Sequence, residues 1–357
     1  MASPGSPEAL ASQLNQITNP DKQKQALTKW ILAMDSMLKV EKQLGGGGQG
    51  WEGLRPALPR LLEWMKEYRP VGVREQAACA VKLLSRHTQD LASHLVSLGV
   101  VPLLQACWSF ETPQSYAGLK EESLAVAYHL LCWEDDAITA PHFLGDAMLD
   151  SITDVLCSCK QVKARDLSLQ CVRILSLGGL INSLPARSVG NLKAFVEVAA
   201  AHNKLASSTL VCLWSLPLQA LQQLDVDLAG LLTALLERVD SKLTNHIYSD
   251  LHCLLLSCRL PQHVAALKAS GLAKFVLQLV NGSSTGSSPG LPLLQDLCLV
   301  PEMTSDLVSL GVVKVTRMLA VCSLGCAGGG QCGEGELVAK RGDHGACEAC
   351  GVWGRGG

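Results

Sequence analysis

The residues near the carboxyl end of the sequence include cysteine and histidine, the residue types that most often coordinate zinc in proteins. Thiolates and imidazoles are the ligands that Zn²⁺ prefers, and a structural site needs four of them in tetrahedral geometry, usually as two close pairs. Only Cys347 and Cys350 form such a pair, because two residues separate them. The set that could hold zinc is Cys332, His344, Cys347 and Cys350. The irregular spacing of the other ligands favours the alternative, in which this region binds no metal.

The remaining residues with reactive side chains show no catalytic arrangement. None of the nine histidines lies in a helical HExxH motif or in an HxE motif next to PCxxC. The glycine run GGGGQG at residues 45–50 lacks the lysine and the preceding strand of a phosphate-binding loop, so we interpret it as a linker. We therefore expect no catalytic residues, no cofactor and no enzymatic activity.

Composition narrows the classes of function. Hydrophobic residues make up 48% of the 357 residues and aromatic residues only 4%, which favours helices packed through aliphatic side chains. The net charge is −2, with 30 basic and 32 acidic residues and no dense basic run, so nucleic acid is not the expected main partner. No stretch of eighteen apolar residues and no secretion signal occur, so we expect no membrane insertion and a cytoplasmic or nuclear location.

Apolar residues recur at helical spacing along most of the chain. Residues 24–42 form an amphipathic pattern that ends at a glycine run, and the pattern resumes within residues 53–68. No segment alternates apolar and polar residues, so we predict an all-α protein without a sheet. Residues 1–23 are polar, and we expect them to be a disordered lead-in.

The helices repeat with a nearly constant spacing. Residues 74–107, REQAACAVKLLSRHTQDLASHLVSLGVVPLLQAC, contain an alanine-rich helix, a polar turn, a second helix, a glycine and a third helix. The sequence LVSLGVV occurs at residues 95–101 and again at 307–313. Candidate bend glycines are separated by 46, 45, 40, 41 and 40 residues, which is the period of armadillo and HEAT repeats. These glycines are Gly99, Gly145, Gly190, Gly230, Gly271 and Gly311.

This order of helices resembles the armadillo/HEAT-like helical repeat family. The resemblance implies a right-handed α-solenoid of about six repeats over residues 24–322. Residues 323–357 differ in composition, since residues 325–357 contain 12 glycines among 33 positions and no apolar period. We expect a disordered Gly/Cys-rich tail there, and we hypothesise that it arises from alternative splicing of a longer solenoid.

The resemblance implies a function in protein binding. In such solenoids the last helix of each repeat lines a concave surface that holds an extended peptide or a partner helix. Import receptors of this family use a ladder of Trp and Asn, and here Cys79 and Leu83 stand at the corresponding positions. We therefore predict a scaffold or adaptor, with Trp108, Trp133 and Trp214 as candidate partner anchors or, alternatively, as core residues between repeats. The alternative function is zinc binding or thiol reactivity in the Cys-rich tail.

Overall fold

The computed structural model describes nine stretches of the chain, which are residues 7–17, 20–44, 54–108, 116–133, 140–178, 180–199, 202–239, 245–282 and 290–312. Every regular element in these stretches is a helix, which confirms the all-α prediction. The chain forms two compact units. Unit 1 contains the described parts of Met1–Val198 and Leu216–Leu224, and unit 2 contains those of Ala199–Ser215 and Asp225–Gly357.

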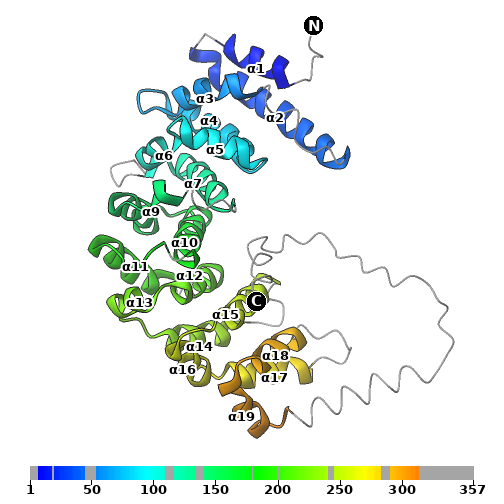
Figure 1. The fold of residues 1–357 in the computed structure, drawn as a ribbon, viewed down its shortest axis with the longest axis vertical. Helices are drawn as coiled ribbons and strands as arrows, with labels where there is room; N and C mark the ends of the chain where they lie inside the picture. The colour runs from blue at the N-terminus through cyan, green and yellow to red at the C-terminus, as the bar shows by residue number, and fades with distance from the viewer. Residues whose placement is uncertain are drawn as a thin grey trace, which may run out of the picture. The chain divides into compact units, whose positions relative to one another are not determined.

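The helices follow one another along the chain with short connections (Figure 1). The first half of the chain contains α1 (Pro7–Asn15), α2 (Pro20–Leu44), α3 (Leu58–Met65), α4 (Val71–Ser85), α5 (Gln89–Ser97), α6 (Val100–Trp108), α7 (Ala117–Leu131), the 3₁₀ helix η3 (Ala140–Phe143), α9 (Asp146–Ser158) and α10 (Val162–Leu177). The second half contains α11 (Ala186–Ala199), α12 (Asn203–Ser215), α13 (Leu218–Leu224), α14 (Leu228–Arg238), α15 (Asn245–Leu256), α16 (Pro261–Ala269), α17 (Leu272–Gly282), α18 (Gly290–Cys298) and α19 (Pro301–Ser309).

Within the described residues, successive helix pairs follow the predicted repeat, with three pairs in unit 1 and two in unit 2, and with α11 in unit 1 and α12 in unit 2 as further helices. The pairs are α3 with α4, α6 with α7, α9 with α10, α14 with α15, and α17 with α18. A short helix, such as α5 or α16, precedes several of the pairs, as the predicted three-helix unit requires. Residues 180–185, in the region where the repeat pattern is weakest, contain no such short helix.

The second helices of consecutive pairs stack on one another. In unit 1, α4 contacts α7 and α7 contacts α10, while in unit 2, α12 contacts α15 and α15 contacts α18 (Figure 1). The first helices form another layer, in which α6 contacts α9 and α14 contacts α17. Ala77, Ala78 and Ala80 of α4 are fully buried, and their small side chains allow neighbouring helices to approach closely. Each unit is therefore a two-layered stack of helices, and the fold is an all-α solenoid.

Three of the predicted bend glycines adopt a conformation that other residues rarely adopt. Gly99, Gly271 and Gly311 have φ angles of 82°, 74° and 86°, in the left-handed region that favours glycine. The two copies of LVSLGVV also fold alike, because the amides of Leu98 and Leu310 each donate a 3.0 Å hydrogen bond to the carbonyl four residues earlier. The sequence repeat is therefore a structural repeat.

The glycine register is wrong at two positions. Gly190 lies inside α11 and Gly230 lies inside α14, so neither of them makes a bend. The bend before α14 is made by Asp225, whose φ angle is 48°. Aspartate tolerates this region because its short side chain can hydrogen-bond locally. Gly145 lies at the expected place, directly before α9, but with an ordinary φ angle of −68°.

The predicted disordered lead-in at residues 1–23 is wrong for its described part. Residues 7–15 form α1, and α2 begins at Pro20. Ala11 and Leu14 of α1 are buried, and α1 contacts α2. A few apolar residues are therefore sufficient to pack this short helix against its neighbour. The predicted tail at residues 323–357 lies outside the described residues, as does the predicted solenoid boundary at residue 322.

In the described part of the chain, no single helix is both long enough and apolar enough to cross a membrane. Two bent pairs, α5 with α6 and α16 with α17, reach the required length and composition together, with bends of 78° and 54°.

Candidate functional site

The stacked second helices of unit 1 present a continuous row of polar side chains. Residues three and four positions apart lie on the same side of a helix. On each second helix, one such side carries polar residues that are partly accessible to solvent. We call this surface the second-helix face. It consists of Glu75, Gln76, Cys79 and Lys82 on α4, Glu121 and Glu122 on α7, and Lys163 and Gln170 on α10.

Ion pairs connect the three helices of this face. Lys82 of α4 pairs with Glu122 of α7, and the Nζ atom of Lys163 on α10 lies 2.5 Å from Oε1 of Glu121. The hydrogen bond to Glu121 raises the pKa of Lys163. Because these charges neutralise one another within the face, it does not present a strong field of one sign.

Cys79 stands at the centre of the second-helix face and is not an activated thiol. Its burial is the main cause that raises its pKa, and the nearby carboxylate of Glu122 raises the pKa further. Burial also raises the pKa of Cys107, Cys157 and Cys258, the last to about 11. Nucleophilic cysteines need a lowered pKa, which favours the thiolate. The raised pKa of these four thiols favours the protonated, unreactive form. The ten cysteines in the described residues carry no disulfide.

Polar contacts also link consecutive second helices in unit 2. The hydroxyl of Ser207 on α12 donates to the carboxylate of Asp250 on α15. His252, also on α15, is hydrogen-bonded through Nδ1 to Asp296 of α18. Both units therefore use side-chain pairs, one repeat apart in sequence, to hold their second helices side by side.

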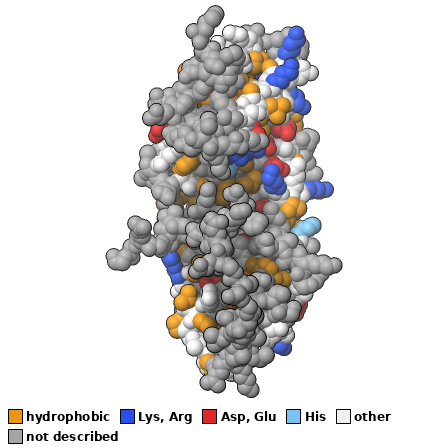
Figure 2. Space-filling model, turned by 90° about the vertical axis from the view of Figure 1, so that its right-hand side faces the viewer, with side chains coloured by type: hydrophobic (Ala, Val, Ile, Leu, Met, Phe, Trp, Pro, Cys, Tyr) orange, Lys and Arg blue, Asp and Glu red, His pale blue; other side chains and the backbone are white. Residues whose placement is uncertain are grey.

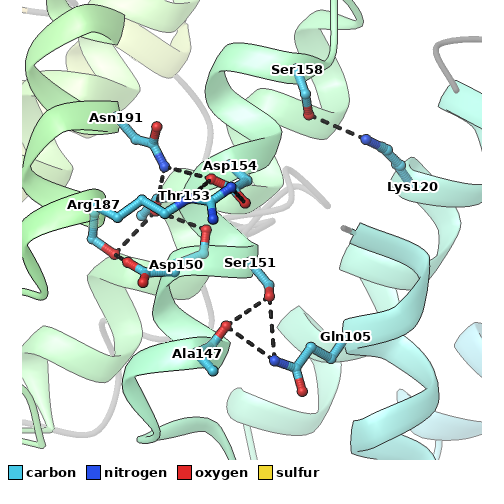
Figure 3. Close-up of polar contacts among 11 residues, drawn as sticks. Gln105, Lys120, Ala147, Asp150, Ser151, Thr153, Asp154, Ser158, Arg187 and Asn191 are labelled. Atoms are coloured by element: carbon cyan, nitrogen blue, oxygen red, sulfur yellow. Dashed lines mark hydrogen bonds and ion pairs between the residues drawn. The ribbon is translucent and has the colours of Figure 1, made fainter. Parts of the chain in front are cut away.

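The first-helix layer of unit 1 contains a partly buried polar network between α9 and α11 (Figure 3). Arg187 donates two hydrogen bonds, of 2.9 and 2.6 Å, to the carboxylate of Asp154, and Asn191 donates a third of 2.9 Å. Ser188 donates to Asp150 at 2.7 Å. Asp154 is only 6% exposed, so its charge is compensated inside the protein by these donors. We interpret this network as a structural connection between repeats.

Two of the three predicted tryptophan anchors are core residues. Trp108 is fully buried, and its Nε1 donates a 2.9 Å hydrogen bond to Ser123. Trp214 is 2% exposed and stacks on His263, with ring centroids 4.2 Å apart. Neither ring is accessible to a partner in this structure, which places both side chains in the core rather than on a binding surface. The helical period places a large side chain on an apolar stripe but does not show whether another repeat covers it.

Trp133 is half-buried and has a different environment. Its Nε1 donates a 2.6 Å hydrogen bond to the backbone carbonyl of Ser85, at the end of α4. The side chain thus connects the end of α7 to the end of the preceding second helix. Part of the ring stays accessible, and Trp133 remains a predicted partner contact.

One histidine in each unit has a lowered pKa, which favours the neutral ring. His263 is 2% exposed, neither of its ring nitrogens has a hydrogen-bond partner, and burial lowers its pKa to about 4. The pKa of His129 is also lowered to about 4, mainly by burial and then by the charges of Arg86 and Lys82.

Metal-binding side chains do not cluster in the described part of the structure. No group of three or more His, Cys, Asp or Glu residues there could hold a metal ion. The candidate zinc ligands lie outside the described residues, and they are Cys332, His344, Cys347 and Cys350.

The charged side chains are mixed over the visible surface. Figure 2 shows basic side chains among acidic and hydrophobic ones, without a large region of one sign between the residues that are not described. This distribution agrees with the near balance of 30 basic and 32 acidic residues.

Comparisons with solved structures identify the fold. The chain matches no protein-family model and no curated protein. It resembles two crystal structures of engineered proteins, each with a TM-score of 0.52, at 14% and 15% identity, covering 70% of this chain and 96% and 98% of theirs. It also resembles computationally designed armadillo repeat proteins for modular peptide recognition, with a TM-score of 0.50, 14% identity, and coverage of 73% of this chain and 98% of theirs.

The fold is of the armadillo type. At these identities the likeness concerns the fold alone. The side chains on the second helices must therefore be described from this chain itself. Cys79 occupies the predicted ladder position of tryptophan on the accessible face, whereas Leu83, at the predicted position of asparagine, is 7% exposed.

Proposed function

We propose that this protein is a non-enzymatic scaffold or adaptor, which binds partner proteins along the second-helix face of its armadillo-type array. The observation that carries the proposal is the alignment of polar side chains on α4, α7 and α10, which are in contact with one another. A row of rigid helices fixes these side chains at regular intervals, so it suits an extended peptide or a helix of a partner.

The chemistry of the face supports binding rather than catalysis. Its thiol has a raised pKa, and its lysines are paired with glutamates. A catalytic site needs a nucleophile or a base with a perturbed pKa that favours reaction, next to a group that orients it. The accessible groups on this face instead supply hydrogen bonds and paired charges, which give specificity to an interface.

Structures with the same fold support a peptide as the type of partner. Among the structures that this chain resembles are armadillo repeat proteins designed for modular peptide recognition. The carry-over to this chain rests on the shared stacking of the second helices. Without the Trp and Asn ladder, the partner must be recognised by different contacts. We infer a partner that hydrogen-bonds to Gln76 and Gln170 and forms ion pairs with the lysines and glutamates of the Lys–Glu pairs.

The test blocks the face without removing core side chains. A Cys79→Arg, Gln170→Arg variant places two long side chains on the second-helix face, and Ala194→Arg places one on an exposed position of α11 as the control. Partners are captured from cell lysate with the unchanged chain and both variants, after thermal melts have shown equal folding. We expect partners that the unchanged chain and the control retain and that the double variant loses.

A crosslinking experiment locates the contact directly. A photoreactive amino acid at position 170 is expected to crosslink to the captured partner, whereas one at position 194 is not. If all three proteins capture the same partners in equal amounts, or if crosslinks form only from position 194, the second-helix face is not the binding site.

A further inference from the structure

Unit 2 contains a surface cleft of about 530 Å³ between two equivalent turns of consecutive repeats. One turn connects α15 to α16 and the other connects α18 to α19, and each ends at a proline in the first turn of the next helix. Most of the lining residues are apolar, and three charged residues lie among them. The lining consists of Leu255, Leu256, Cys258, Arg259, Leu260, Pro261, Val264, Asp296, Leu299, Val300, Pro301 and Glu302.

Two large apolar side chains in this cleft are exposed to water. Leu256 is 52% exposed and Leu299 is 72% exposed, the latter the largest value among the exposed large hydrophobic residues of the described chain. A single exposed leucine needs no explanation, but exposed leucines that line one cleft form a patch of the kind that marks binding sites. The cleft volume lies within the usual range of ligand-binding sites, which is about 300–1,000 Å³.

The charges of the cleft favour a cationic group at one wall. Glu302 is exposed in the first turn of α19 and forms no ion pair with a described residue. Asp296 is only 7% exposed and accepts a hydrogen bond from His252. Two helices end and two begin at these turns, so the partial charges of the helix ends oppose one another. The side chains therefore decide the field at this wall, which is negative at Asp296 and Glu302.

We propose that this cleft is a second protein-binding site, which takes a short extended segment of a partner with an apolar side chain next to a lysine or arginine. The apolar side chain lies between Leu256 and Leu299, and the basic group lies over Glu302. The residues of this site differ from those of the second-helix face of unit 1, so the two proposals are tested independently of one another.

The experiment uses three fluorescent dodecapeptides, which alternate leucine with lysine, leucine with glutamate, and serine with lysine. Binding is followed by fluorescence anisotropy and by the alkylation rate of individual cysteines with N-ethylmaleimide. Cys258 lines the cleft, while Cys298 is exposed and is not part of the lining, so it is an internal reference. We expect the leucine–lysine peptide to slow alkylation of Cys258 and to leave Cys298 unchanged. The leucine–glutamate peptide should bind about three- to tenfold more weakly.

Variants assign the contacts within the cleft. Leu299→Ser should abolish the protection of Cys258, whereas Leu310→Ser should not, because Leu310 is 46% exposed but does not line the cleft. Glu302→Lys should reverse the preference, so that the leucine–glutamate peptide binds better. All three positions are exposed, and equal thermal melts are expected.

Four outcomes of the peptide experiments overturn the proposal. They are absence of leucine–lysine binding, unchanged alkylation of Cys258 at saturating peptide, equal binding of the serine–lysine peptide, and a preference that Glu302→Lys does not alter. Protection of Cys258 that grows with protein concentration in the absence of peptide would instead identify a second copy of this chain as the occupant, and would overturn the proposed partner segment.

Discussion

Arg187 and Lys163 pair with carboxylates that are buried to different degrees. The Asp154 side chain is 8% exposed and the Glu121 side chain is 19% exposed, while Arg187 and Lys163 themselves are 56% and 64% exposed. A buried carboxylate that loses its donors stays desolvated, whereas a more accessible carboxylate regains water and loses only a screened attraction. The degree of burial therefore decides how much each pair contributes to stability.

A pair of alanine variants tests this difference. Arg187→Ala should lower the free energy of unfolding by about 2 kcal/mol, because it leaves the charge of Asp154 with fewer donors. Lys163→Ala should lower it by less than about 0.5 kcal/mol. Urea denaturation measures both values. Equal losses would show that the network in Figure 3 is not a buried structural contact.

His263 makes stability depend on pH in a defined direction. The unfolded chain binds a proton at the ordinary pKa of 6.5, whereas the folded state binds it only at about 4 because the ring is buried. The stability is complete above pH 6.5, falls as the pH drops from about 6.5 to about 4, and is constant below that range, with a total loss of about 3 kcal/mol. His129 acts in the same direction.

The variant His263→Phe should reduce this pH dependence, since phenylalanine can stack on Trp214 and does not titrate. His142→Phe, at an exposed position of η3, is the matched control and should leave the profile unchanged. Urea denaturation between pH 4 and pH 8 measures the effect. A profile that is the same for both variants would contradict the assignment to His263.

At the scale of the helices, glycine has opposite roles at Gly99 and Gly190. Gly99 has a φ angle of 82° at the bend before α6, whereas Gly190 lies within α11. A Cβ atom added at either position would meet nothing within 4 Å, so backbone conformation alone determines the effect of a substitution. Left-handed conformation penalises alanine, while a helix favours it over glycine.

The two alanine substitutions should therefore change stability with opposite signs. Gly99→Ala should destabilise the protein by about 1–2 kcal/mol. Gly190→Ala should stabilise it by about 0.5–1 kcal/mol, because it removes backbone freedom from the unfolded chain. Thermal or urea denaturation measures the difference. Two changes of the same sign would contradict the assignment of Gly99 as a bend and Gly190 as a helical residue.

For the whole molecule, the balance of charge predicts weak binding to nucleic acids. The formal net charge is −2, and lysines on the second-helix face are paired with glutamates. The paired lysines of this face are compensated by their glutamates and are poorly suited to neutralising phosphates and releasing counterions. We expect no anisotropy change of a labelled 30-base-pair DNA or a single-stranded RNA up to about 10 μM protein at about 150 mM salt. Tighter binding with a steep salt dependence would show a basic surface that the described residues do not contain.

The sequence by itself determined the helical class, the repeat period and the approximate number of repeats. Apolar residues at helical spacing and the recurrence of LVSLGVV are local features, so they persist whatever the helices contact. The bend at Gly99 was also predictable, because a left-handed backbone is a property of one residue. The bend at Asp225 was not, since aspartate adopts this conformation only when its surroundings impose it.

Only the tertiary structure decided which side chains are accessible. Trp108 and Trp133 lie at the ends of apolar helices, yet Trp108 is fully buried with a hydrogen bond to Ser123, whereas Trp133 is half-buried with a hydrogen bond to the end of α4. The Lys–Glu pairs of the second-helix face and the cleft between Leu256 and Leu299 join residues about one repeat apart, which no local pattern connects. The period of the sequence predicted the helices, whereas the surface available to a partner depends on how the repeats stack, because stacking determines what each repeat covers on the next.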